Sequence, residues 1–269
     1  METKISVLIL TQNSAKTLPR TLESVKNFDD IVVIDGGSKD DTESIAKSYH
    51  ARFIHHPFEG FSPQRNKALQ EAKYDWCLFV DSDEYVTSEL KNELYRIVDS
   101  STPYVLFKVF RTEYILGEEI KYGHGRSGYQ ERFLRKSHVH YQGEVHEYPV
   151  INGKKPEANS PLLGIINKDF RLLHNPAVSM NEFVMKVGNY SILRAKEKMG
   201  HKRSVNALEV IVTFPLTLLQ IGFKSMKAGK RGLMAAIMEA VHRTLVKLLL
   251  YEETHFKKEK KKFLITKSK

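Results

Sequence analysis

The sequence of 269 residues contains a single cysteine, Cys77, so no disulfide bond can form within the chain. It also lacks a signal pattern at the N-terminus, because Lys4 leads directly into a short apolar run. No internal repeat and no low-complexity linker is visible. These absences predict a main domain that lies in the cytosol. With 41% hydrophobic residues, the chain is long enough to bury one full core and to carry an extension.

Charge divides the sequence into two parts. Residues 1–175 hold 23 Lys and Arg against 25 Asp and Glu, whereas residues 176–269 hold 19 against 7, so the formal charge goes from −2 to +12. We therefore expect a compact domain over residues 1–175 and a basic helical extension over residues 176–269. Nucleic acid would be one explanation for the basic charge. The apolar pattern of the extension favours an anionic membrane surface instead, and no nucleic-acid partner is predicted.

Two apolar stretches in the extension support a membrane surface. Val205 to Phe223 is strongly apolar, but polar residues and Pro215 interrupt it, so it is marginal as a spanning helix and is predicted to form an in-plane or re-entrant hairpin. Leu233 to Tyr251 has helical spacing, with basic residues on both sides. Such an amphipathic helix can lie in an anionic bilayer interface. The alternative is a helix packed on the main domain or on the partner subunit of a homodimer.

Apolar runs of strand length alternate with helical patterns in the first third of the chain. The strands are predicted near residues 5–10, 31–34, 53–54 and 76–80, with helices near residues 18–25, 43–48 and 64–72. This order indicates an α/β fold with a parallel sheet and right-handed crossovers. Residues 104–110 predict a later strand, followed by a loop over residues 117–128.

The predicted strand at residues 76–80 ends in Asp81-Ser82-Asp83-Glu84. Open α/β sheets bind ligands just beyond the carboxyl ends of their strands. Mg²⁺ and Mn²⁺ prefer carboxylate oxygens and share their coordination with substrate phosphates, so Asp81 and Asp83 are interpreted as a D-x-D metal clamp. An acidic turn at the end of a strand is the alternative.

Two further motifs have residues that suit a nucleotide. Asp35 closes a strand, and its carboxylate would accept a base N–H or a ribose hydroxyl, while Gly36 and Gly37 allow a close backbone approach. The alternative is an ordinary glycine-rich turn that caps the next helix. The planar guanidinium group of Arg65 has several N–H donors and suits a phosphate, and the side-chain amide of Asn66 has both a hydrogen-bond donor and an acceptor. Arg65 would otherwise pair with a surface acid.

These motifs carry a family resemblance. Thr11-Gln12-Asn13, the segment from Val33 to Thr42, Gln64-Arg65-Asn66-Lys67-Ala68 and Asp81-Ser82-Asp83-Glu84 resemble family 2 glycosyltransferases of the GT-A fold. The resemblance is strongest to the bacterial lipopolysaccharide-core and related glycan-assembly branch. It is dense over residues 4–90, and it recurs at residues 129–135 and 145–147.

The resemblance implies a GT-A (nucleotide-diphospho-sugar transferase) fold with a mostly parallel central sheet and a helical C-terminal extension. It also implies that a sugar is moved, with inversion, from a nucleotide-diphosphate donor such as a UDP-sugar to a lipid-linked or lipopolysaccharide-core glycan. The acceptor would place the enzyme on the inner face of the cell membrane. Two alternatives are a nucleotidyltransferase and a non-catalytic basic binding module. The first would favour a glycine-rich loop where Thr11-Gln12-Asn13-Ser14 stands.

The same resemblance implies roles for individual residues. Asp83 would bind Mg²⁺ or Mn²⁺ directly, and Asp81 would contact the ribose or support the metal through water. Glu147 is the leading candidate for the general base, with His146 as the runner-up, although this pair could instead support the metal. Further donor contacts are expected from Thr11, Asn13, Asp35, Gly37, Arg65 and Asn66.

The predicted strand near residue 130 carries candidates for binding the acceptor or the diphosphate. Gln130 and Arg132 share one face of this strand and Arg135 has the other, so all three would face inward only with a bulge. Arg132 is therefore favoured. The histidines at 138, 140 and 146 lack the spacing of a zinc site.

Overall fold

A computed structural model describes residues 4–115, 117–120, 127–143, 147–175, 180–200, 204–227 and 229–267. The chain forms two compact units. The first unit combines Met1–Thr112 with Gly128–Asn175, and the second combines Glu113–Ser127 with Pro176–Lys269. The second unit thus contains the basic extension expected from the charge and also a short segment from the middle of the chain.

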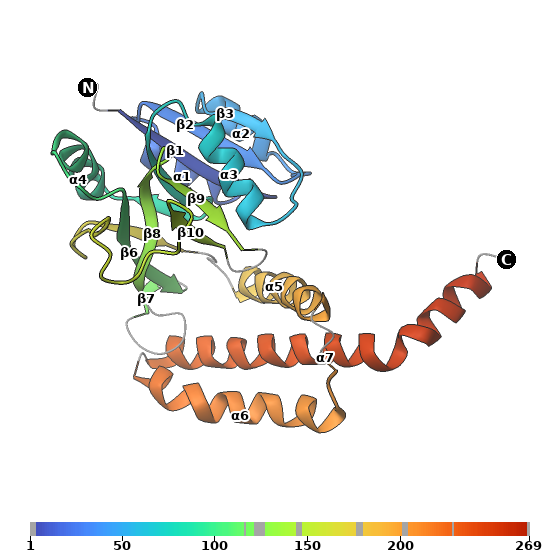
Figure 1. Cartoon of the computed structure of the whole chain (residues 1–269). Helices are drawn as coiled ribbons and strands as arrows, with labels where there is room; N and C mark the ends of the chain where they lie inside the picture. Colours follow the sequence, from blue (N-terminus) through green and yellow to red (C-terminus); the bar gives the residue numbers. More distant parts are fainter. Residues whose placement is uncertain are drawn as a thin grey trace. The chain divides into compact units, whose positions relative to one another are not determined.

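The first unit begins with the alternating strands and helices that the apolar runs predicted. These are β1 (Ile5–Thr11), α1 (Leu18–Val25), β2 (Asp30–Asp35), α2 (Thr42–Ser48), β3 (Arg52–His55), α3 (Phe61–Glu71) and β4 (Trp76–Asp81). The strands pair in the parallel order β3-β2-β1-β4, and Figure 1 shows β1, β2 and β3 at the blue end of the chain. All the residues of β2 are buried, which is typical of a strand covered on both faces of a parallel sheet.

The sheet continues beyond β4 with antiparallel pairing. The elements that follow up to residue 174, apart from the short strand β7 (Glu118–Glu119), are β5 (Glu84–Val86), α4 (Ser88–Asp99), β6 (Leu106–Ile115), β8 (Gly128–Arg135), β9 (Val139–Gln142), β10 (Tyr148–Ile151), β11 (Leu163–Ile165) and β12 (Arg171–His174). The full order of the sheet is β3-β2-β1-β4-β8-β6-β12-β5, with β8 antiparallel to both of its neighbours. The α/β fold with a central sheet is confirmed. The parallel pairs are those among the first four strands of the sheet order and the pair of β11 with β6.

Two apolar cores cover the faces of this sheet. One contains the inward side chains of α1 and α4, and the other contains those of α3 and of the β9–β10 hairpin. Trp76 on β4 stacks on Phe133 of β8 with a centroid distance of 4.8 Å, which joins the parallel and antiparallel halves. The carboxyl ends of β1, β2 and β4 therefore project from a rigid support.

A β-bulge interrupts the pairing of β8 with β6. Phe107 is opposite Phe133 but Lys108 is opposite Glu131, so Arg132 is the extra residue on β8. Arg132, Phe133 and Leu134 are all buried, because both faces of the sheet are covered here. The bulge lies between Gln130 and Arg135, so the regular alternation on which the sequence argument rested does not hold along this strand.

The second unit consists mainly of α5 (Met180–Gly200), α6 (Ala207–Met226) and α7 (Gly229–Lys267), with the short strand β7 (Glu118–Glu119). The helix α7 packs against both α5 and α6, and its buried residues include Ala236 and Ala240. The predicted helix over residues 233–251 is confirmed as part of α7. Within the described chain, none of the helices has the length of apolar sequence that crossing a bilayer requires.

The in-plane or re-entrant hairpin predicted within residues 205–223 is wrong. From Ala207 onward these residues lie in the single helix α6, which continues through Pro215. Proline in a helix removes one backbone hydrogen bond, here to the carbonyl of Ile211, but this loss does not end the helix. The hairpin that does form is made by α6 and α7, whose connection is the basic turn after Met226.

Candidate active site

The loops that follow β1 and β2 are held together by hydrogen bonds. The Asn13 N–H donates to Ser38 Oγ at 2.7 Å, and the Lys39 N–H donates to Asn13 Oδ1 at 2.8 Å. The Gly36 N–H donates to the Thr11 carbonyl at 2.9 Å. Thr11 and Asn13, both predicted to bind the donor, therefore connect the two loops to each other.

Asp35 organises the second of these loops. Its carboxylate accepts from the N–H groups of Gly37 and Ser38 at 2.9 and 2.8 Å, from the Ser38 hydroxyl, and from Thr11 Oγ1 at 3.3 Å. Burial alone would raise the pKa of Asp35, but the hydrogen bonds from Ser38 and Gly37 hold that pKa below its ordinary value. A carboxylate has roughly four acceptor positions, so a bound nucleotide would have to replace one of these donors.

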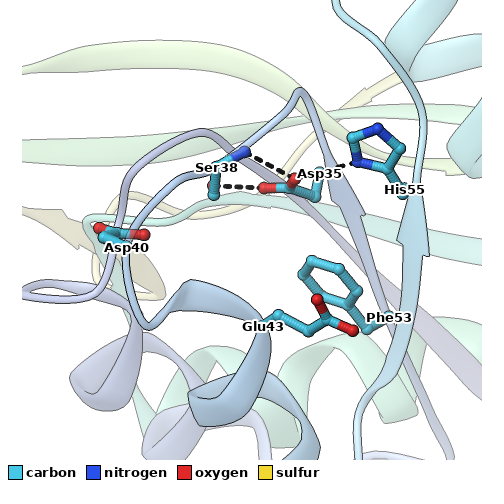
Figure 2. A pocket seen from close by; sticks show the side chains of 6 residues that line it. All are labelled: Asp35, Ser38, Asp40, Glu43, Phe53 and His55. Carbon is cyan, nitrogen blue, oxygen red and sulfur yellow. Dashed lines mark hydrogen bonds and ion pairs between the residues drawn. The ribbon is translucent and has the colours of Figure 1, made fainter.

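A cavity of about 240 Å³ lies beside Asp35 (Figure 2). Its lining residues are Asp35, Ser38, Asp40, Glu43, Phe53 and His55. His55 Nδ1 is 3.5 Å from Asp35 Oδ2, and Gly37 has a φ of +104°, which favours glycine at this turn. Three of the lining side chains are acidic. This cavity therefore suits a ligand that donates hydrogen bonds, such as a base or a sugar, and does not suit a phosphate.

Asp81 is paired with Arg132. The Arg132 guanidinium donates to Oδ1 and Oδ2 of Asp81 at 3.1 and 2.5 Å and also to Glu84 Oε1 at 3.1 Å. Arg111 Nη1 lies 3.2 Å from the same Glu84 oxygen. The predictions that Arg132 contacts the diphosphate and that Asp81 supports the metal remain untested. In this structure the two side chains bind each other.

The buried ion pairs shift the pKa values of both carboxyl groups. Burial would raise the pKa of Asp81, but the positive charges of Arg132 and Arg65 hold it well below its ordinary value. Burial raises the pKa of Glu84, which has a negative neighbour in Asp81. Asp81 therefore keeps its charge at the end of β4. Arg65 of α3 lies over the ring of Phe79 on β4 at 4.9 Å, which places its positive charge near this end of the strand.

Asp83 lies next to a residue that the sequence did not single out. His174 Nε2 is 3.3 Å from Asp83 Oδ1, and the Asn175 N–H donates to the Asp83 carbonyl at 3.3 Å. The antiparallel pairing of β12 with β5 produces this contact, because His174 is opposite Glu84. The sequence signal for His174 was weak: a histidine that ends a short apolar strand about 90 residues after the D-x-D motif.

Arg65 reaches from α3 to Glu147. Its Nε donates to Glu147 Oε1 at 3.1 Å, and its guanidinium lies over the rings of Phe79 and Tyr141 at 4.9 and 5.3 Å. The Nη1 atom of Arg65 is buried and has no hydrogen-bond partner among the described residues. Pairing with an acid was the alternative that the sequence predicted for Arg65, and Arg65 does pair with an acid, Glu147. The unpartnered Nη1 leaves a donor for a ligand oxygen.

Asn66 fixes the hairpin beside α3. Its amide donates to the Tyr141 carbonyl at 2.9 Å and accepts from the Tyr141 N–H at 2.8 Å. Ser62 Oγ adds a hydrogen bond to the Gly143 carbonyl at 2.6 Å. Asn66 thus serves in this structure as a link between α3 and β9. Its predicted contact with the donor stays a prediction.

The other predicted residues have fewer contacts in the described structure. His146 lies outside the described residues, so the pairing of Glu147 with His146 is not described. Gln130 is partly exposed on β8, opposite Val109. His138 Nδ1 hydrogen-bonds Ser137, and no group of three metal-ligating side chains occurs in the part of the chain that the structure describes.

The fold and these motifs agree with a family of known enzymes. The family model "Glycosyl transferase family 2" matches residues 6–148, which is more than half of the chain, so the chain belongs to this family and is a glycosyltransferase. This membership favours the predicted transferase over the two alternatives, a nucleotidyltransferase and a non-catalytic binding module.

Individual relatives extend the similarity beyond the matched region. The chain is 26% identical over 261 residues to the lipopolysaccharide core biosynthesis glycosyltransferase LpsC of Rhizobium meliloti (strain 1021), and 92% of each chain is covered. The resemblance to the lipopolysaccharide-core branch is thereby confirmed. An uncharacterized glycosyltransferase of Rickettsia bellii is 29% identical over 75% of this chain and 70% of its own length. The crystal structure of S. aureus TarS 1–349 in complex with UDP covers 70% of this chain and 64% of its own, with a TM-score of 0.47 and 17% identity.

Proposed function

We propose that this protein is an inverting, metal-assisted glycosyltransferase that moves a sugar from a UDP-sugar to a lipopolysaccharide-core or lipid-linked glycan. Membership of family 2 supports the transfer of a sugar from a nucleotide donor, and the similarity to LpsC supports the acceptor class. The observation that carries the metal part of the proposal is the pair of Asp83 and His174, whose side chains lie 3.3 Å apart just beyond β4.

The residues present fit a divalent cation. Asp83 would supply a carboxylate oxygen and His174 an imidazole nitrogen, and substrate phosphates with water would complete the coordination. A mixed oxygen and nitrogen set favours Mn²⁺ over Mg²⁺, because Mg²⁺ prefers oxygen ligands alone. A cation bound there would hold the diphosphate and offset the charge that develops on it as the glycosidic bond breaks.

The neighbouring side chains have separate tasks in this proposal. The unpartnered Nη1 of Arg65 would donate to an oxygen of the diphosphate, while the cavity beside Asp35 would take the base or the ribose. Arg132 would keep the Asp81 carboxylate oriented at the end of β4.

Glu147 would act as the general base. Its Oε1 is held by Arg65, and Oε2 would accept the proton of the acceptor hydroxyl. The hydroxyl oxygen then bonds to the anomeric carbon on the face opposite the diphosphate. The bond between that carbon and the diphosphate oxygen breaks, and the configuration inverts. His146 is the second candidate for the same task.

The acceptor class implies where the enzyme works. A lipid-linked acceptor would hold the catalytic domain, over residues 1–175, at the cytoplasmic face of the cell membrane. The basic extension over residues 176–269 would then contact anionic lipid. A homodimer is the alternative use of the extension.

The test compares Asp83→Asn with Asp99→Asn. Asp99 is exposed at the end of α4, so its substitution removes the same charge outside the motifs of the proposed site. We expect Asp83→Asn to lower transfer from UDP-sugars to core oligosaccharide, with Mn²⁺ present, on the order of a hundredfold or more. Asp99→Asn should retain the wild-type rate. Normal turnover by Asp83→Asn would exclude the metal assignment, and incorporation of a nucleotide into product would exclude sugar transfer.

A further inference from the structure

The helix α6 has its apolar side chains on the outside. Leu208, Ile211, Leu219 and Phe223 are 68, 71, 63 and 74% exposed. Their spacing places them on one face of the helix, together with Pro215 and Met226. Single exposed apolar residues are ordinary, but a continuous row along a helix marks a surface that binds another apolar surface.

The opposite face of α6 contains polar side chains that are buried. Thr217 and Ser225 are 3 and 1% exposed, and Lys247 of α7 forms an ion pair with Glu209. A helix on the surface of a protein in water normally has the reverse arrangement, with polar residues outside. Together with the packing of Val210 on the buried cluster of this unit, these contacts hold α6 against α7 and leave its apolar row exposed.

The exposed face carries no described charge along its length and has cations at its C-terminal end. Gln220 is the polar residue among the exposed positions between Leu208 and Met226, and Lys227 and Lys230 are exposed just beyond them. This arrangement, an apolar face followed by exposed lysines, matches a lipid bilayer with anionic headgroups.

We propose that α6 lies in the plane of an anionic membrane, with the row from Leu208 to Met226 inserted among the acyl chains. The lysines at the end of the row contact the headgroups. The proposal specifies the membrane contact of the proposed function and rests on that function for its lipid-linked acceptor. The sequence predicted the membrane contact for both apolar stretches of the extension. The proposal assigns it to α6 alone, because residues 233–251 lie in the part of α7 that packs against α5 and α6.

A second copy of the chain is the other occupant to consider. Residues 176–269 have a formal charge of +12, so two copies that meet through α6 would bring like charges together. The same charge attracts the negative surface of a membrane. The positive charge of the extension therefore favours an anionic bilayer over a second copy of the chain as the partner of α6.

The experiment uses the full chain and measures its co-sedimentation with vesicles of phosphatidylcholine that contain phosphatidylglycerol. The variant Leu219→Ser tests α6, and Ile165→Ser is the matched control, because Ile165 on β11 is 62% exposed against 63% for Leu219. We expect Leu219→Ser to lower the vesicle affinity about tenfold and the double variant with Phe223→Ser about a hundredfold. Ile165→Ser should bind as the wild type does.

A second measurement separates insertion from attraction by charge. In Phe223→Trp, the new indole should be quenched by lipids brominated on their acyl chains, whereas Trp76 is buried in the first unit and should not respond. Equal vesicle binding by the wild type and Leu219→Ser would overturn the proposal, and so would a dimer that Leu219→Ser converts to a monomer. Stabilisation by UDP-sugar in solution reports on the proposed function separately, and it should be the same for all these variants.

Discussion

At the scale of single residues, the pairing of Glu147 with Arg65 gives the general-base assignment a clear test. Glu147→Gln retains an oxygen that can accept from Arg65 Nε but removes the carboxylate that would take the proton. We therefore expect turnover to fall on the order of 10²–10⁴-fold with little change in donor affinity. Steady-state kinetics and calorimetry with UDP-sugar measure the two quantities.

The control is Glu157→Gln, which makes the same chemical change at an exposed position. It should retain wild-type turnover. If Glu147→Gln loses donor affinity in step with turnover, Glu147 acts by holding Arg65. Unchanged turnover would move the role of the base to His146.

The sequence singled out individual carboxylates, but it did not predict the side chains that contact them. Asp35, Asp81 and Asp83 were identified because carboxylates directly after buried strands are visible in the sequence. Their partners were not visible, because Arg132 reaches Asp81 through a bulge and His174 reaches Asp83 through the pairing of β12 with β5. These contacts depend on the register of distant strands, which one sequence does not specify.

At the scale of elements, the link between α3 and β9 predicts how Asn66 contributes. Asn66→Ala removes both hydrogen bonds to the Tyr141 backbone and leaves a buried N–H without its partner. We expect the free energy of unfolding to fall by about 1–3 kcal/mol, while the affinity for UDP-sugar stays the same. Urea unfolding and calorimetry provide the measurements.

Asn27→Ala serves as the control, since Asn27 is exposed and the substitution is identical. Its unfolding should match that of the wild type. A loss of donor affinity in Asn66→Ala without a loss of stability would contradict the structural role and favour the contact with the donor that the motif suggested.

Elements with a strong local pattern were predicted well. The strands β1, β2 and β4 follow from continuous apolar runs, and the helices between them follow from apolar spacing. The hairpin at residues 205–223 failed because Pro215 and the scattered polar residues look like breaks in the sequence. The helix continues because α7 covers its polar face, and this long-range packing is invisible in a local window.

At the scale of the whole molecule, the division into two units predicts two steps of thermal unfolding. The residues proposed to bind the donor all belong to the first unit. A ligand that binds only the folded form of one unit raises the melting temperature of that unit. With UDP-sugar and Mn²⁺, we expect calorimetry to show one transition that moves upward and one that does not. The same sugar with a metal chelator is the control, and a single transition that moves as a whole would contradict independent units.

The passage of the chain between the units also orders its assembly during synthesis. Glu113–Ser127 is made early but belongs to the second unit, whose helices follow residue 175. Until the helices of the second unit are synthesised, the described part of this segment has the contacts of its own hairpin, where β7 pairs with β6. The first unit can complete its sheet once residue 175 has left the exit tunnel of the ribosome, before the second unit exists. The exposed face of α6 forms later, when α7 is also available to pack against that helix.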